Sequence, residues 1–125
     1  MMESTLKVLD DEDLEFVHIL HSLGIQRTVA IIITYLSNAG EATSREIEQA
    51  THLSQPEVSM TIRDLRDENR IVEREVKTGG KGRPSLVYTL RTPISEIIKR
   101  LEDEKLREHA ETMESIQKLR DLTSS

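Results

Sequence analysis

The sequence contains no cysteine and no tryptophan, and it has only one phenylalanine and two tyrosines. Without cysteine neither a disulfide nor a thiolate metal site can form, which agrees with a reducing cytoplasm. With so few aromatic side chains, the core must be aliphatic. The longest apolar run, residues 29–33, is far shorter than the roughly 20 residues of a membrane-spanning helix. The N-terminus also lacks the basic and apolar regions of a signal peptide, so we expect a cytoplasmic protein.

Motifs of the common enzyme classes are missing as well. The chain has no nucleophile elbow, Walker loop, dinucleotide fingerprint or zinc-protease helix. The glycine-rich stretch 79–82 joins two expected strands, whereas a phosphate-binding loop opens a helix. His18 and His21 have a spacing at which both could touch one metal ion, but no further ligand is identified. We therefore expect no enzymatic activity, no cofactor and no metal.

Charge is distributed unevenly along the chain. The net charge is −6, but residues 1–42 carry −5, residues 43–91 carry +1 and residues 92–125 carry −2. The acidic cluster 10–13 suits the first turn of a helix, where carboxylates favour the positive end of the helix dipole. The central stretch is therefore the part of the chain whose local charge permits contact with phosphate groups.

Apolar spacing predicts two helices before this central stretch. The first spans about residues 6–23 and begins its regular turns near Asp10 or Asp11. The second, residues 26–38, is so apolar that we expect it at the centre of the core, and Gly40 ends it. We interpret Glu41 and Ala42 as loop.

Two capping boxes then mark the starts of two short helices. Thr43 is followed three residues later by Glu46, and Ser54 by Glu57. The first helix ends near Thr51, and a turn at His52 and a buried Leu53 leads into the second helix, residues 54–69. Val58, Ile62 and Leu65 define the buried face of this second helix.

A second helix of this kind lies in the major groove of DNA in helix–turn–helix proteins and presents its N-terminal residues to base edges. The side chains expected to point outward can donate to or accept from bases, or can contact a thymine methyl group. They are Gln55, Pro56, Ser59, Met60 and Arg63. Glu57 is an alternative base contact, but we favour its role as the capping partner of Ser54.

A β-hairpin follows. Residues 71–77 form its first strand and 86–90 its second, with Leu86, Tyr88 and Leu90 on one face. The tip, residues 78–85, has three glycines in four residues and includes Lys81, Gly82 and Arg83. With Lys77, the two basic side chains form a cluster that contains no acid. A Gly-Arg-Pro core resembles the AT-hook, so we expect this wing to enter the minor groove.

The last segment, residues 92–125, reads as one helix with Thr92 at the N-cap, Pro93 in the first turn and no breaker before Thr123. A helix of about 30 residues has nothing in a small domain to bury its apolar stripe, so we expect it to pair with a second copy. The residues of this dimer seam are Ile94, Ile97, Ile98, Leu101, Met113 and Ile116.

The run from Ile47 to Leu90 resembles the winged helix–turn–helix transcription regulators of the MarR, ArsR and TrmB group. The phrases L-S-Q-P-E-V-S-M-T-I-R-D-L and G-K-G-R-P-S-L-V-Y-T-L are especially similar to small archaeal regulators. This resemblance implies recognition-helix contacts from Gln55 to Arg63, wing contacts at Lys81 and Arg83, and homodimers. The absence of cysteine departs from the metal-sensing ArsR relatives.

The expected fold is mainly α with a small β-hairpin (α+β). A DNA-binding domain, residues 1–91 with a core at 26–91, precedes a C-terminal dimerisation helix. The expected function is a sequence-specific regulator, nucleoid-associated, that binds a pseudo-palindromic site in double-stranded DNA. One alternative is a winged-helix protein–protein interaction module of the transcription machinery. Another is a regulator gated by a small-molecule effector that the sequence does not identify.

Overall fold

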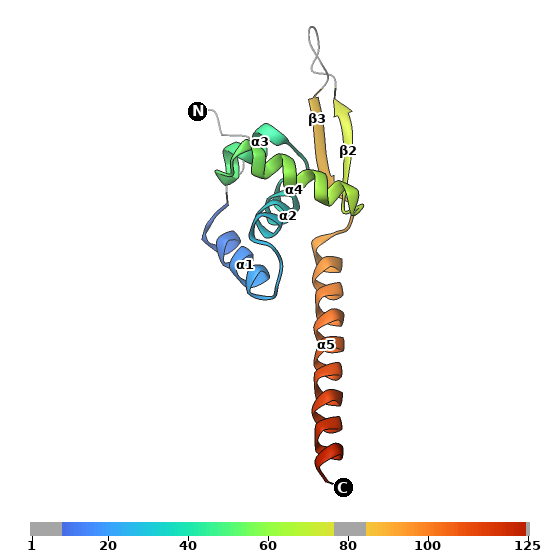
Figure 1. Cartoon of the computed structure of the whole chain (residues 1–125). Helices are drawn as coiled ribbons and strands as arrows, with labels where there is room; N and C mark the ends of the chain where they lie inside the picture. Colours follow the sequence, from blue (N-terminus) through green and yellow to red (C-terminus); the bar gives the residue numbers. More distant parts are fainter. Residues whose placement is uncertain (1–8, 77–84, 125) are drawn as a thin grey trace. The chain divides into compact units, whose positions relative to one another are not determined.

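The computed structural model describes residues 9–76 and 85–124, which form five helices and three strands (Figure 1). The contacts within the chain divide it into one unit up to Pro93 and a second unit from Ile94. The first unit contains α1 (Asp11–Ser22), α2 (Arg27–Ala39), β1 (Ala42–Thr43), α3 (Ser44–Thr51), α4 (Gln55–Asp67), β2 (Ile71–Val76) and β3 (Ser85–Leu90). The second unit is α5 (Ile94–Thr123). The mainly α fold with a small hairpin is confirmed.

Helix α2 is the centre of the first unit, as its composition predicts. Seven consecutive residues, from Ala30 to Leu36, are buried, and α2 contacts α1, α3, α4 and β3. Among the fully buried side chains, the largest are Ile32, Leu36 and Ile47, so the core is aliphatic. Tyr35 is also buried at 2% exposure, and its burial, together with the negative charge of Glu46, raises the pKa of its phenol.

Helix α1 begins at Asp11, as expected from the acidic cluster, and a capping box fixes its start. Asp10 is the N-cap and precedes the helix; its Oδ1 accepts from the Asp13 N–H at 2.9 Å, and Asp13 Oδ2 accepts from the Asp10 N–H at 3.0 Å. The Asn38 side chain donates to Asp13 at 2.7 Å and links α1 to the end of α2. The acidic cluster is thus a helix start, as predicted.

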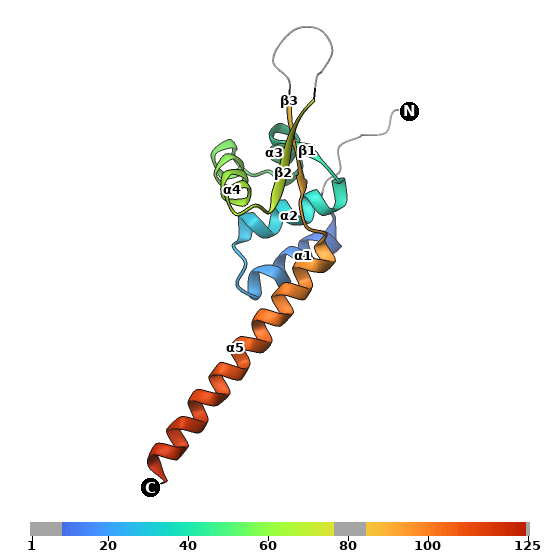
Figure 2. The same cartoon turned by 90° about the vertical axis from the view of Figure 1, so that its right-hand side faces the viewer.

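The sheet has a strand that the sequence reading missed. Residue 42 was expected in a loop, but Ala42 and Thr43 form β1, which pairs antiparallel with β3 opposite Tyr88 and Val87. The strand order β1-β3-β2 makes the returning strand of the hairpin the central one (Figure 2). Consequently the successive residues Val87 and Tyr88 are each only 7% exposed, whereas Leu86 nearer the tip is 38% exposed.

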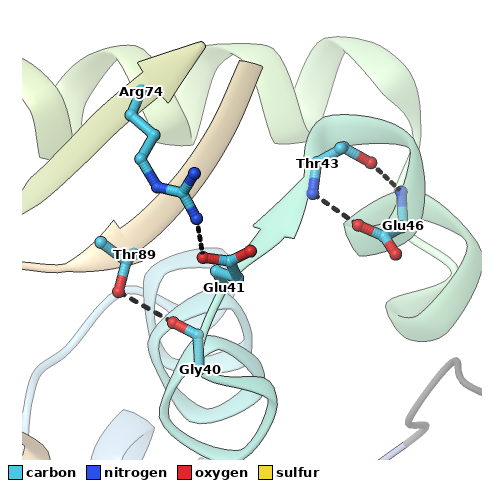
Figure 3. A network of polar contacts seen from close by, with 6 residues as sticks. All are labelled: Gly40, Glu41, Thr43, Glu46, Arg74 and Thr89. Atoms are coloured by element: carbon cyan, nitrogen blue, oxygen red, sulfur yellow. Dashed lines mark hydrogen bonds and ion pairs between the residues drawn. The ribbon is translucent and has the colours of Figure 1, made fainter. Parts of the chain in front are cut away.

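A polar network joins the segment just before this short strand to the hairpin (Figure 3). Arg74 of β2 forms an ion pair with Glu41, and the Thr89 hydroxyl of β3 donates to the Gly40 carbonyl at 2.8 Å. Gly40 ends α2 with a φ of +86°, a conformation that glycine adopts without strain. The chain can therefore turn directly from the central helix into the sheet and on to α3.

Helix α5 has the predicted length of 30 residues, although it begins at Ile94 rather than at Pro93. None of its side chains is buried. Over residues 9–76 and 85–124, no helix is long and apolar enough to cross a membrane.

One polar atom within the described core has no hydrogen-bond partner, the hydroxyl of Thr34 in α2, a residue that is 4% exposed. A buried hydroxyl without a partner costs about 1–3 kcal/mol. Thr34→Val should therefore leave the free energy of unfolding unchanged or raise it by up to about 2 kcal/mol, measured by urea denaturation. Ile32→Ala, in the same helix, should lower it by about 2–5 kcal/mol. A loss of more than about 1 kcal/mol in the valine variant would mean that the hydroxyl is bonded.

Candidate nucleic-acid interface

Helices α3 and α4 both begin at reciprocal capping boxes, as predicted. At α3, Thr43 Oγ1 accepts from the Glu46 N–H at 3.1 Å and Glu46 Oε1 accepts from the Thr43 N–H at 2.8 Å (Figure 3). At α4, Ser54 Oγ accepts from the Glu57 N–H at 3.3 Å and Glu57 Oε1 accepts from the Ser54 N–H at 3.0 Å. Each box satisfies two backbone donors and fixes the first residue of its helix.

The turn between the two helices is tight. His52 ends α3 in the left-handed conformation with φ of 62°, and the Thr51 hydroxyl donates to the Ile47 carbonyl at 2.6 Å. Leu53 is half-buried rather than buried as expected. The turn thus reverses the chain by its backbone conformation, and α4 packs against both α2 and α3.

The buried stripe of α4 determines which side of the helix faces outward. Val58, Ile62 and Leu65 are buried as predicted, and Thr61 joins them. The predicted DNA-contacting residues of α4 are all exposed and lie in its N-terminal nine residues, with Met60 at 60% exposure. An unbranched apolar side chain that is mostly exposed at this position is suited to contact an apolar surface.

The C-terminal half of α4 has a different character. Asp64, Asp67 and Glu68 are exposed acids there, which phosphate groups would repel. Arg66 donates to Glu73 of β2 at 3.1 Å, and this hydrogen bond with the charge of Glu73 raises the pKa of its guanidinium. Arg66 thus ties α4 to the hairpin. Within residues 9–76 and 85–124, Arg63 makes no ion pair and stays available to a ligand.

The predicted wing contacts, Lys77, Lys81, Gly82 and Arg83, lie outside the described residues. The strands that carry them are described, and β2 pairs with β3 in register from Ile71 opposite Leu90 to Val76 opposite Ser85. The described part of the hairpin therefore ends at the pair Val76 and Ser85.

The structure adds one basic residue that the sequence reading did not select. Arg45 is exposed in the first turn of α3, the helix that precedes α4. The capping box at Thr43 identifies Arg45 as a first-turn residue, where a basic side chain and the free N–H groups of the helix start can contact the same phosphate.

The ring of His21, one of the two histidines considered for a metal ion, lies beside a backbone carbonyl: its Nδ1 is 3.0 Å from the Ile25 carbonyl oxygen. No metal-binding group of three or more histidines and acids occurs among the described residues.

The predicted dimer residues all lie on α5. Ile94, Ile97 and Leu101 are half-buried, whereas Ile98, Met113 and Ile116 are 44%, 49% and 37% exposed. They are thus apolar side chains on a helix whose described part has no buried residue.

The succession of α2, α3, a tight turn, α4 and the β2–β3 hairpin, with β1 completing the sheet, defines a winged helix–turn–helix domain. Residues 23–83 match the model of the MarR family. Within this segment the chain is similar to the MarR-family winged helix–turn–helix transcriptional regulators. Its sequence matches none of the curated proteins with significance.

Solved structures show the same fold. A possible transcriptional regulator from Methanosarcina mazei Go1 is 13% identical with a TM-score of 0.57, over 89% of each chain. A MarR family regulator from Neisseria meningitidis is 18% identical with a TM-score of 0.50, over 87% of this chain and 81% of that one. NadR in complex with 4-hydroxyphenylacetate is 20% identical with a TM-score of 0.53, over 87% and 79%. At these identities the structures share their fold with this chain.

Glu57 provides a pH-dependent test of the site's geometry. Hydrogen bonds from the backbone N–H and then the side chain of Ser54 lower the pKa of its carboxyl group. Since the folded-state pKa is depressed, its stabilisation is present above the unfolded pKa of about 4.3 and is lost as pH falls through the folded value. Glu57→Gln should therefore lower the melting temperature at pH ~7 and change it little at pH ~3.

The control for this prediction is Glu15→Gln, which changes an exposed carboxylate in the middle of α1. It should alter the melting temperature little at either pH. A glutamine variant at position 57 that melts like the unsubstituted protein at both pH values would mean that the carboxylate does not hold the start of α4.

Proposed function

We propose that this protein is a sequence-specific, DNA-binding regulator of transcription that acts as a homodimer. The recognition helix is α4, which lies in the major groove, and the wing, residues 78–85, enters the adjacent minor groove. The observation that carries the proposal is the exposed N-terminal half of α4, where Pro56, Met60 and Arg63 lie opposite the buried face and are flanked by Gln55 and Ser59.

The chemistry of this face supports readout of bases. The side-chain amide of Gln55 can pair with adenine and the guanidinium of Arg63 with guanine, while Met60 suits a thymine methyl group. Pro56 and Ser59 complete the surface, with Ser59 able to bond a base or a phosphate. The acidic residues at the C-terminal end of α4 favour an orientation in which only its N-terminal half enters the groove.

Contacts to the backbone would come from the parts around α4. Arg45 at the start of α3 is placed to neutralise a phosphate on one side of the groove. Lys77, Lys81 and Arg83 supply the basic side chains of the wing, and Gly82 allows its close approach to DNA. Arg66 links α4 to the hairpin through its ion pair with Glu73. One connected unit can therefore contact both grooves.

A homodimer would bind a pseudo-palindrome whose half-sites are about 10 bp apart or a multiple of that. The proposed test is selection of fragments that the full chain retains from the genomic DNA of its host, with the salt concentration stated. Retained fragments should share a pseudo-palindromic sequence. Retention of no fragment at low salt would reject DNA binding and favour a winged-helix module that binds another protein.

Arg63→Ala should lower the affinity for a selected fragment by about 1–3 kcal/mol and relax the preference at one base position. The reason is that Arg63 is the cation of α4 that no described acid engages. Affinity would be measured by fluorescence anisotropy on the selected fragment and on single-base variants. The matched control, Arg70→Ala, removes an exposed arginine paired with Glu68 at 3.1 Å and should have a smaller effect.

The double variant with Lys81→Ala and Arg83→Ala should bind every sequence more weakly. The reason is that the wing contacts phosphates and depends on the width of the groove. Its plot of log affinity against log salt should be shallower by about 2, one per lost phosphate contact. A salt titration of the double variant and the unsubstituted protein measures both effects. Identical slopes would remove the wing from the interface.

A further inference from the structure

Helix α5 has one apolar face that is interrupted in the middle. This surface, called the α5 face below, consists of Ile94, Ile97, Ile98 and Leu101 in its first part and Ile116, Leu119 and Leu122 in its last part. At about 100° per residue, these side chains fall within a half-turn sector of the helix. Its middle is polar and contains Lys105, Glu108, Thr112 and Ser115.

We infer that the α5 helices of two copies pair antiparallel, with the two-fold axis beside His109. This inference extends the proposed function and rests on the proposal that the protein is a homodimer. The partner is a second copy because the two apolar parts lie at nearly equal distances from position 109. Each copy therefore offers the surface that the other needs.

The spacing of the apolar residues fits this axis. In the antiparallel arrangement, Ile98 lies between Leu119 and Leu122 of the second copy, and Leu101 lies between Ile116 and Leu119. Each residue is thus a knob between two residues of the facing helix, the packing that stabilises paired helices. Ile98 and Leu119 are 44% and 64% exposed in the single chain, so they have apolar surface to bury.

The polar middle decides the direction. In a parallel, in-register pair, Lys105 would face Lys105 and Glu108 would face Glu108, and like charges in direct opposition are destabilising. In the antiparallel pair, Lys105 lies across from the hydroxyls of Thr112 and Ser115, and Glu108 across from His109 and Thr112. Lys105 and Glu108 of one chain are already 3.2 Å apart, so their charges stay balanced.

Charges beside the α5 face point the same way. The acidic run 102–104 follows Leu101 in the first part of the helix. A parallel pair would bring the acidic run of one copy beside that of the other. The antiparallel pair separates the two runs, each of which lies across from residues 114–117, and it also opposes the two helix dipoles.

The absence of native cysteine allows the direction to be measured in the full chain. Spin labels would be attached singly to Lys99→Cys, Ala110→Cys and Lys118→Cys, and distances within the dimer measured by double electron–electron resonance. With 1.5 Å per residue, the antiparallel pair separates the two labels at 99 by roughly 30 Å along the axis, those at 118 by nearly as much, and those at 110 by almost nothing.

The expected result is therefore a short distance at position 110 and much longer distances at 99 and 118. Three similar short distances would show a parallel pair and overturn the inference, while the proposed dimer would stand. Sedimentation equilibrium on the same samples reports the dimer itself. If the protein sediments as a monomer, both the antiparallel pairing and the proposed homodimer are rejected. DNA binding is then tested separately by the fragment selection.

A pair of alanine variants tests whether the α5 face is the contact. Leu101→Ala should raise the dimer dissociation constant at least about tenfold, because it removes a central knob. The control, Leu106→Ala, truncates a residue that is 62% exposed and lies about 120° away from Ile94 around the helix. Its dissociation constant should change less than about threefold. Equal effects of the two variants would overturn the assignment of the α5 face.

Discussion

The arrangement of the candidate interface depends on where two helices start, and two reciprocal capping boxes set those starts. At Ser54 the box fixes the first residue of α4, and packing of Val58, Ile62 and Leu65 against the core sets which side of the helix faces inward. Arg63 lies on the other side and is exposed. The carboxylate of Glu57 thus belongs to the construction of the site, and its chemistry is used in the cap rather than on a base.

The second constraint is the burial of α2. A helix that is buried over seven successive residues needs neighbours on every side, and α1, α3, α4 and β3 supply them. The link from α2 to the sheet is short, so the hairpin is held against the same core by Gly40, Glu41 and β1. On the hairpin side, Arg74 of β2 pairs with Glu41, and Thr89 of β3 donates to the Gly40 carbonyl. The wing and the recognition helix are therefore carried by one body.

Much of this could be predicted from local patterns. Capping boxes, the apolar α2 and the glycine at its end act over a few residues, and the sequence shows them directly. Strand β1 could not be predicted, because two residues carry no periodicity and their pairing with Tyr88 and Val87 is a contact between distant segments. The start of α1 near Asp10 or Asp11 was predicted from the acidic cluster, because carboxylates favour the first turn of a helix. The exposed face of α4 was predicted from its buried stripe, whereas Arg45 was missed because a single basic residue on a short helix gives no pattern.

The central claim is that the N-terminal half of α4 contacts DNA. It is tested most directly by titrating the ¹⁵N-labelled full chain with a retained DNA fragment and following the backbone amide resonances. The account predicts that the largest shifts fall between Gln55 and Arg63, at Arg45 and in residues 78–85, while the amides of α1 stay unchanged. Shifts that fall on α1 or α5 and leave α4 unaffected would contradict it.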